Sequence, residues 1–301
     1  MADAELEQLI AGLRANGPDL SAPVEQVRAD FEAMLATIPV AEDLRFAPVE
    51  LGGIPGIRTE APGAAEDAAL LYLHGGAYVI GSAQGYRALA AELARAACAV
   101  GYAIDYRLAP EHVFPAAVED AVIAYRALLD RGTDAKRIVI AGDSAGGGLA
   151  LALLVALRDR GQPLPAAALL ISPWADLACS GGSIASKAAE DPSLTEAGLR
   201  ANAAHYLGGG DAGHPLASPI HADLSGLPPI LIQVGSAEIL LDDAVRIGAA
   251  AGAAGTRVRL DIWPHMVHVW HAFGFILTAG RAAITEAGDF LADHSGSRGR
   301  F

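Results

Sequence analysis

The sequence is poor in cysteine, with only Cys98 and Cys179 among its 301 residues. Two thiols cannot supply the dense disulfide framework that holds small secreted domains together. Cys98 lies in the apolar run from Ala96 to Val100, which predicts a buried strand. We therefore expect two inert core thiols and no structural need for a disulfide.

An excess of basic charge is also missing, since 35 acidic residues outnumber 21 basic ones and give a formal net charge of −14. Because an acidic chain repels phosphate backbones, we expect no nucleic-acid partner. The longest uncharged apolar run, Ala145 to Leu157, falls short of the roughly 20 residues that a transmembrane helix needs. The acidic start from Met1 to Glu5 is unlike a signal peptide. These absences predict a soluble cytoplasmic protein without a transmembrane segment.

Hydrophobic residues make up 52% of the chain, enough for the core of one large α/β domain or two small ones. Short apolar runs alternate with longer helical patterns from residue 68 onward. The strands are predicted at Ala68–Leu73, Ala99–Asp105, Arg137–Ala141, Ala167–Ser172, Pro229–Val234 and Val258–Trp263. The helices are predicted at Ala116–Leu129, Ala145–Asp159, Asp242–Ala251 and Arg281–Ala292. This order favours a mostly parallel sheet with helices on both faces.

Two further regions flank or interrupt the alternating pattern. Residues 1–43 show helical apolar spacing, interrupted by prolines, and residues 44–60 alternate like strands, with turn signals at Gly52, Gly53 and Gly56. Residues 178–215 are rich in Gly, Ala and Ser, with a helical stretch near Glu196–Tyr206. A long insertion between two strands is a candidate lid over a site.

The strongest chemical motif is Gly142-Asp143-Ser144-Ala145-Gly146, a Gly-x-Ser-x-Gly sequence between an apolar strand and an apolar helix. In that context the motif predicts a strained turn that exposes the Ser144 hydroxyl as a nucleophile. The N-terminus of the following helix would direct its positive dipole end at the developing negative charge. The alternative is a glycine-rich phosphate-binding turn, but the Gly-Lys-Ser/Thr ending and the dinucleotide spacing are both missing.

A second glycine-rich segment, His74-Gly75-Gly76-Ala77-Tyr78, follows the strand that ends at Leu73. Adjacent glycines let the backbone approach a substrate closely, so its N–H groups can stabilise the oxyanion of a tetrahedral intermediate. We predict that Gly75 and Gly76, with Ala145 after the nucleophile, form this oxyanion hole. A plain glycine turn is the alternative.

With these residues in place, the chain resembles the bacterial branch of the hormone-sensitive lipase family of esterases. The likeness spans about residues 68–275 and rests on three segments in the family's order: His74-Gly75-Gly76, Asp105 to His112, and Gly142 to Gly147. Later landmarks are Ser218-Pro219, Leu227-Pro228-Pro229 and Met266-Val267-His268. The chain departs from the family pattern at two positions. Ala77 stands where a third glycine is common, and Glu238 stands where the acidic residue of the catalytic triad is usually aspartate.

The resemblance implies an α/β-hydrolase fold with a helical cap. Residues 1–43 would supply N-terminal cap helices, and residues 44–301 would form the catalytic domain, with a cap insertion near 178–215. It also implies hydrolysis of short- to medium-chain acyl esters without a cofactor or a metal. The expected partner is a small-molecule ester, and a homodimer is compatible with the family.

We expect the catalytic acid and base on the loops that follow late strands, in the chain order serine, acid, histidine. His268 follows the strand at 258–263 and matches the family's catalytic position. His265 and His271 are its rivals. Their spacing of three could suggest a metal site, but no carboxylate or cysteine framework accompanies them.

Glu238 is the predicted acid, in the loop after the strand at 229–234. Asp242 and Asp243 remain alternatives, although they precede a helical run, where carboxylates commonly cap N–H groups. The sequence thus predicts a Ser144–His268–Glu238 serine esterase. An amidase or peptidase with the same triad, and a non-catalytic receptor on a hydrolase fold, are the alternative functions.

Overall fold

A computed structural model describes residues 2–298 of the chain. Within them, eight strands form one sheet in the order β1-β2-β4-β3-β5-β6-β7-β8. The strands are β1 (Arg45–Leu51), β2 (Ile54–Glu60), β3 (Ala65–Leu73), β4 (Ala99–Ile104), β5 (Ile138–Asp143), β6 (Ala167–Ile171), β7 (Ile230–Gly235) and β8 (Val258–Trp263). β1 and β2 pair antiparallel, as do β2 and β4, and every later neighbour pairs parallel. The predicted α/β-hydrolase fold with a mostly parallel sheet is confirmed.

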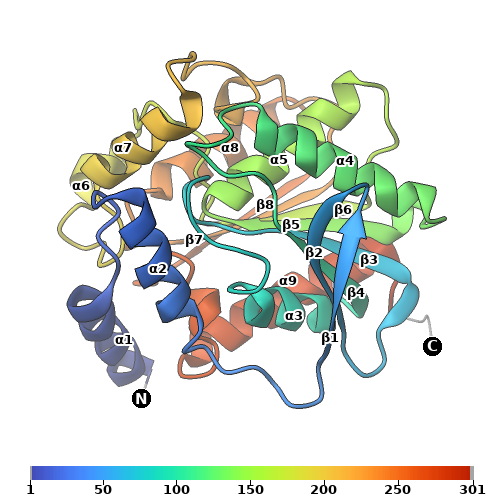
Figure 1. The fold of residues 1–301 in the computed structure, drawn as a ribbon, viewed down its shortest axis with the longest axis horizontal. Coiled ribbons are helices and arrows are strands. Elements are labelled where there is room, and N and C mark those ends of the chain that lie inside the picture. The colour runs from blue at the N-terminus through green and yellow to red at the C-terminus, as the bar shows by residue number, and fades with distance from the viewer. Residues whose placement is uncertain (1, 299–301) are drawn as a thin grey trace.

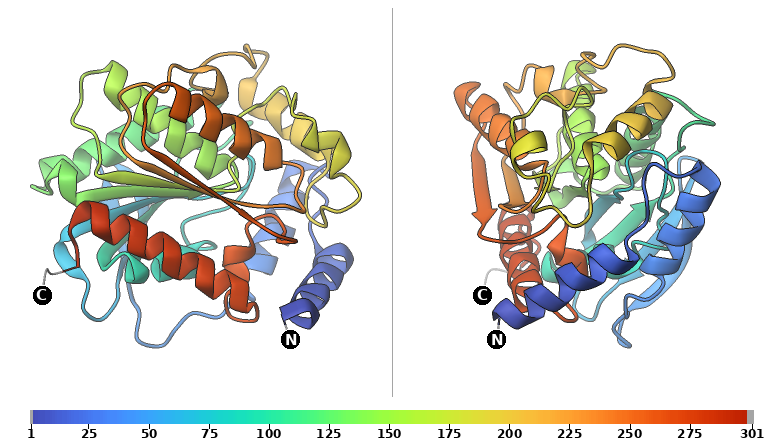
Figure 2. Two further views of the ribbon diagram at one scale, coloured as in Figure 1. Left: turned by 180° about the vertical axis from the view of Figure 1, so that it is seen from behind. Right: turned by 90° about the vertical axis from the view of Figure 1, so that its left-hand side faces the viewer.

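Helices lie on both faces of this twisted sheet (Figures 1 and 2). The helices are α1 (Ala2–Asn16), α2 (Val24–Leu35), α3 (Arg87–Ala96), α4 (Ala116–Asp130), α5 (Ala145–Asp159), α6 (Ser183–Ser186), α7 (Glu196–Leu207), α8 (Leu241–Ala253) and α9 (Thr278–Ser295). Short 3₁₀ turns occupy Ala135–Arg137, Pro219–His221 and Trp270–Phe273. α4, α5 and α8 cover one face, while α3 and α9 cover the other (Figure 2, left). Among the longer helices, α3 is the one that the apolar pattern had not indicated.

The central strands are buried from both sides, which explains their nearly continuous apolar sequence. In β3, Leu71 and Leu73 face the core under α4 and α5, whereas Leu70 and Tyr72 face the core under α3 and α9. Successive side chains of a strand point to opposite faces, so one strand contributes to two cores. This packing fixes the carboxyl ends of the strands, where the loops of the site begin.

Two local predictions need correction. Gly52 and Gly53 do form the turn between β1 and β2, both with positive φ, but Gly56 lies inside β2. A Cβ at Gly56 would stand 2.2 Å from the Ala103 carbonyl oxygen, so glycine is needed there for close strand pairing and not for a turn. Cys98 is in the turn before β4, with φ 52°, instead of in a strand.

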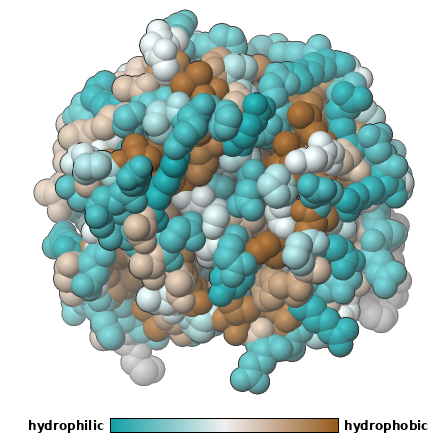
Figure 3. Space-filling view, in the orientation of Figure 1, coloured by the Kyte–Doolittle hydropathy of each residue, from teal (hydrophilic) through white to brown (hydrophobic). Residues whose placement is uncertain are grey.

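One face of the molecule is mainly hydrophilic. On the face in Figure 3, hydrophilic residues cover most of the area and apolar residues show in separate patches. No helix among residues 2–298 is long and apolar enough to span a bilayer.

Candidate active site

Ser144 occupies the turn between β5 and α5, with φ 53° and ψ −122°. A non-glycine residue in such a region costs on the order of 1–3 kcal/mol, which the surrounding structure must offset. Here the Ser144 N–H donates to Ile171 O at 2.8 Å, and its carbonyl oxygen accepts from Trp174 N at 2.9 Å. The strained turn therefore holds the hydroxyl at the N-terminus of α5, as predicted from the motif.

The two glycines of the motif are required by contact. A Cβ at Gly142 would lie 2.2 Å from the Gly146 carbonyl oxygen, and one at Gly146 would lie 2.0 Å from the Leu73 carbonyl oxygen. Both neighbours are backbone atoms and cannot move aside cheaply. The glycines thus allow β5, α5 and the end of β3 to converge at Ser144.

The segment after β3 reaches the same point, but its donors differ from the prediction. The Gly75 N–H donates to Asp143 Oδ1 at 2.9 Å, so it is already used inside the protein. Among the described residues, no protein acceptor takes the N–H groups of Gly76, Ala77 or Ala145. The structure therefore disfavours the predicted Gly75 as an oxyanion donor, because its N–H already donates to a buried carboxylate.

Ala77 is the family departure at this segment, and it adopts φ 53°. A left-handed backbone costs an alanine about 1–2 kcal/mol that a glycine would not incur. Two residues further on, the same loop is bound by Arg28 of α2, which donates to Val79 O at 2.8 Å and also pairs with Glu111. The N-terminal helices thereby help to fix the glycine-rich segment.

Asp143, next to Ser144, is fully buried and bonds to the segment that follows β3 and to β3 itself. Its Oδ1 accepts from the Tyr72 hydroxyl at 2.5 Å as well as from Gly75 N. Burial raises the pKa of Asp143 to about 6, against the lowering effect of the Tyr72 bond and of His268. These contacts tie β3 to β5 under the site, which agrees with a structural role.

His268 and Glu238 meet as a buried pair. The Nδ1 atom of His268 lies 2.8 Å from Oε2 of Glu238. The other carboxylate oxygen accepts from Ser172 Oγ at 2.8 Å and from Gly235 N at 2.7 Å. With every carboxylate oxygen bonded, Glu238 presents a fixed acceptor to Nδ1 of His268 and favours the tautomer that carries its proton on that atom.

Burial of His268 disfavours its charged form, but the hydrogen bond and charge of Glu238 outweigh it, helped by Asp191 and Asp143. The pKa of His268 is therefore raised above its usual 6.5. A raised pKa strengthens the imidazole as a proton acceptor and stabilises the imidazolium that forms when it takes a proton.

Ser144 and His268 line one cavity, together with Gly76 and Ala77. Among residues 2–298, no hydrogen bond joins Ser144 Oγ to His268. Such contacts are often long and tighten only when substrate is bound. The structure thus brings the three predicted side chains to one place, with the acid–base contact formed.

The rival residues lie elsewhere or are otherwise occupied. His265 is exposed on the loop, where its N–H donates to Ser236 Oγ. His271 is buried, with Nε2 2.9 Å from Gln233 Oε1, and burial together with His268 lowers its pKa to about 3. His271 is therefore a neutral histidine of the core, held by its contact with Gln233.

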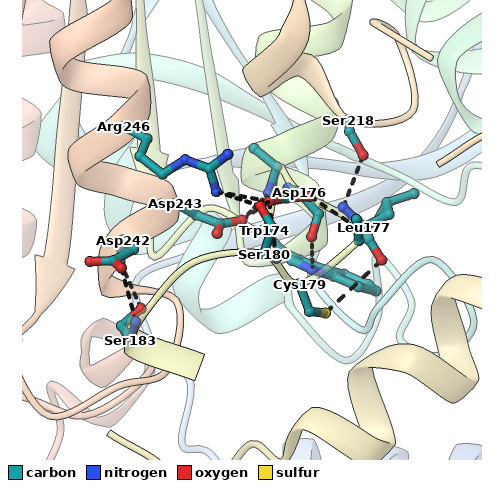
Figure 4. Close-up of polar contacts among 12 residues, drawn as sticks. Trp174, Asp176, Leu177, Cys179, Ser180, Ser183, Ser218, Asp242, Asp243 and Arg246 are labelled. Carbon is teal, nitrogen blue, oxygen red and sulfur yellow. Dashed lines mark hydrogen bonds and ion pairs between the residues drawn. The ribbon is translucent and has the colours of Figure 1, made fainter. Parts of the chain in front are cut away.

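Asp242 and Asp243 belong to a separate polar network (Figure 4). Asp243 accepts from Ala175 N at 2.8 Å and Asp176 N at 2.9 Å, and Asp242 accepts from Ser183 N at 2.9 Å. Asp176 in turn pairs with Arg246 at 2.8 Å. The network fastens the segment after β6 and the start of α6 to α8, so these aspartates join neighbouring segments to α8 and do not cap it. Among the described residues, no cluster of three His, Cys, Asp or Glu side chains could hold a metal ion.

The cavity over Ser144 has a volume of about 110 Å³ and is mostly apolar. Part of its wall comes from the N-terminal region, including Leu13 and Phe31, and part from the insertion, including Leu194 and Leu199. The two regions touch where Asn202 Nδ2 donates to Leu20 O at 3.0 Å. Segments far apart in sequence therefore line the site together, and the labelled helices α1, α2, α6 and α7 lie on the same side of the molecule in Figure 1.

Two residues around the site were not found from the sequence. Ser172 follows β6 and links the acid to the histidine loop, since it donates to Glu238 and accepts from Val269 N at 3.3 Å. The sequence offers one signal for Ser172, namely its place at the carboxyl end of β6, the strand beside β5. Asp191 lies in the irregular insertion, where neither motif nor periodicity marks it.

Comparisons with known proteins agree with this geometry. A family model described as alpha/beta hydrolase fold matches residues 70–272, more than half of the chain. An acetyl-hydrolase of Streptomyces hygroscopicus is 56% identical over 227 residues, covering 75% of this chain and 76% of the relative. An esterase of Acinetobacter venetianus is 32% identical over 285 residues, covering 94% of each chain.

Solved structures give the same result. An esterase from the bacterial hormone-sensitive lipase family matches with a TM-score of 0.94 and 46% sequence identity, over 97% of this chain and 99% of that one. A hormone-sensitive lipase from a metagenome library matches with a TM-score of 0.93 and 41% identity, over 98% of each chain. The chain belongs to the bacterial hormone-sensitive lipase family of α/β-hydrolases and is a serine-hydrolase esterase.

Proposed function

We propose that the protein is a carboxylesterase that cleaves short- to medium-chain acyl esters with Ser144 as nucleophile, His268 as base and Glu238 as the acid. The observation that carries the proposal is the fixed His268–Glu238 pair, at 2.8 Å, with His268 lining the same cavity as a strained serine at a helix N-terminus. Each group has the role that the serine–histidine–acid mechanism needs.

In the first half-reaction, Ser144 Oγ attacks the ester carbonyl while His268 Nε2 takes its proton. Glu238 holds the Nδ1 proton and stabilises the imidazolium. The carbonyl oxygen becomes an oxyanion, and we propose that the N–H groups of Gly76, Ala77 and Ala145 bind it, since these three have no acceptor in the described protein. The α5 N-terminus adds its positive dipole end.

The tetrahedral intermediate collapses when His268 gives its proton to the leaving alkoxide, and the alcohol departs. A water molecule then attacks the acyl-Ser144 carbonyl, with His268 again taking the proton. Collapse of the second intermediate releases the carboxylic acid and restores the Ser144 hydroxyl. The residues present account for both steps by proton transfer and electrostatic stabilisation alone.

The size of the cavity favours the shorter substrates. The cavity is mostly apolar, with a volume of about 110 Å³, which suits a short acyl chain. The name of the Streptomyces relative, an acetyl-hydrolase, supports the same end of the range. We propose that residues 1–43 and 178–215 form the cap that limits chain length, because both line the cavity.

A p-nitrophenyl ester series from acetate to dodecanoate tests the proposal. We expect the highest kcat/KM at acetate or butyrate and a steep fall beyond about eight carbons. Ser144→Ala should lose several orders of magnitude in kcat and all labelling by a fluorophosphonate, with an unchanged melting temperature. Parental activity in this variant would refute the nucleophile. A matched anilide that is cleaved as fast as the ester would instead indicate an amidase.

A further inference from the structure

Asp191 connects two parts of the site that the proposed mechanism treats separately. It lies between α6 and α7 in the insertion, and only 8% of its surface is exposed. Its Oδ1 accepts from Ser193 N at 2.8 Å and Leu194 N at 2.9 Å, and its Oδ2 accepts from Ile239 N at 2.9 Å. A buried carboxylate with three N–H donors is held in one position.

The two ends of this connection have different functions. Ser193 and Leu194 line the cavity over Ser144, whereas Ile239 directly follows the acid Glu238. One side chain therefore links the wall that contacts substrate to the loop that carries the acid. A displacement of either loop would be transmitted to the other through Asp191.

Asp191 also adds charge near His268, because Ser193 and Leu194, whose N–H groups it binds, line the same cavity as His268. The carboxylates that act on His268 are Glu238, which is bonded to it, and Asp191 and Asp143, which act through space. The remaining neighbour, His271, is neutral and bonded to Gln233. Burial raises the pKa of Asp191, but His268 and the three N–H bonds favour its ionised form. An ionised Asp191 stabilises a positively charged His268.

We propose that Asp191 is a positioning residue for ester hydrolysis, which holds the cavity wall at Ser193 and Leu194 against the Glu238 loop and supplies a second, remote negative charge to His268. This inference rests on the proposed function. It assigns to the insertion a direct part in tuning the triad, in addition to enclosing the substrate.

Asp191→Asn tests both parts, because it keeps the shape and removes the charge. One amide oxygen cannot accept all three N–H bonds, and the amide NH₂ must face an N–H donor. We expect KM for p-nitrophenyl butyrate to rise about 3- to 10-fold. We also expect the kinetic pKa of His268 to fall by several tenths of a unit, less than the 1–3 units that a charge in contact produces.

Asp211→Asn is the matched control, since Asp211 is an exposed carboxylate of the same insertion that accepts from Gly213 N at 2.8 Å. It should retain the parental KM and kinetic pKa. A melting temperature and the rate of fluorophosphonate labelling against pH complete the comparison. An Asp191→Asn enzyme with parental KM and kinetic pKa would overturn the proposal. So would one that is less stable but has an unmoved kinetic pKa.

If Asp191→Asn does not fold, Asp191→Glu decides. Glutamate keeps the charge but, one methylene longer, cannot keep all three bonds, so it should retain the parental kinetic pKa and raise KM; a parental KM overturns the proposal. These failures differ from failure of the proposed function. If the proposed function were wrong, Ser144→Ala would stay active. If only the Asp191 proposal were wrong, Ser144→Ala would be inactive and the Asp191 variants would behave like the parent.

Discussion

Glu238→Gln is the change that most directly tests how the acid works. Its carboxylate uses one oxygen for Ser172 and Gly235 and the other for His268. In the variant, the amide oxygen can keep the two bonds to Ser172 and Gly235, which places the NH₂ group against His268 Nδ1. The reverse orientation would set the NH₂ group against the Gly235 N–H, a donor facing a donor, so it is disfavoured.

An NH₂ group can donate only to an unprotonated Nδ1. The imidazole proton then moves to Nε2, which can no longer take the proton of Ser144. In serine hydrolases the wrong tautomer lowers kcat by about 10⁴-fold, which corresponds to roughly 5 kcal/mol of activation free energy. Because the two bonds to Ser172 and Gly235 survive, we expect the melting temperature to change by only a few degrees.

The assay is kcat for p-nitrophenyl butyrate at pH 8, with thermal unfolding of the same preparations. Asp242→Asn serves as the control, because its amide oxygen can still accept from Ser183 N and it has no contact with His268 among the described residues. Its activity should match that of the parent. If Glu238→Gln kept more than a tenth of the parental kcat, or if Asp242→Asn lost as much, Glu238 would not be the orienting acid.

Three other results are expected. The pKa of His268 is raised above 6.5, and the neutral imidazole is the proposed base. The value of kcat/KM for a neutral ester should therefore increase with pH, with the midpoint of the increase above pH 6.5. A profile that is flat from pH 5 to 9 would contradict this. Gly146→Ala should destabilise the fold by about 1–3 kcal/mol, because the new Cβ would collide with the Leu73 carbonyl oxygen. Gly12→Ala is the control, because a Cβ there would have no atom within 4 Å. It should be neutral or stabilising in a thermal melt. Burial raises the pKa of Asp243 from 3.8 to about 7, so the folded state binds the proton more tightly and stability falls as pH rises through that interval, by up to about 4 kcal/mol. Asp243→Asn should flatten that fall between about pH 4 and 7. A melting temperature that keeps the parental pH dependence would exclude the effect.

Much of the fold was predictable because double-sided burial leaves a strong sequence pattern. The helix predicted at Ala145–Asp159 has those bounds in the structure, and the strand predicted at Val258–Trp263 also keeps its bounds. α3 escaped prediction, although its apolar residues face the core. It follows the irregular glycine-rich segment, where no clear boundary signal separates loop from helix.

The positions of the candidate site residues followed from strand ends, but their hydrogen bonds did not. Adjacent glycines at 75 and 76 indicate a segment that can approach an oxyanion, yet they do not tell which N–H groups point toward it. That depends on Asp143, whose carboxylate takes the Gly75 N–H and turns that donor away from the cavity. The direction of one N–H is set by a side chain 68 residues later in the chain, and no local pattern contains this information.

The length of the Glu238 side chain has a physical use in the same loop. Oε1 of Glu238 bends back to the N–H of Gly235, three residues earlier, while Oε2 reaches His268. A Cβ at Gly235 would lie 2.1 Å from the Met266 carbonyl oxygen, so the acid loop and the histidine loop are already in close contact at that point. The extra methylene lets one side chain bind both Gly235 in its own turn and His268 in the neighbouring loop. Ser172, which follows β6, donates a further hydrogen bond to the same carboxylate. The acid is therefore positioned by three strand ends at once, which is why a residue of different length can occupy the position without losing the contact to His268.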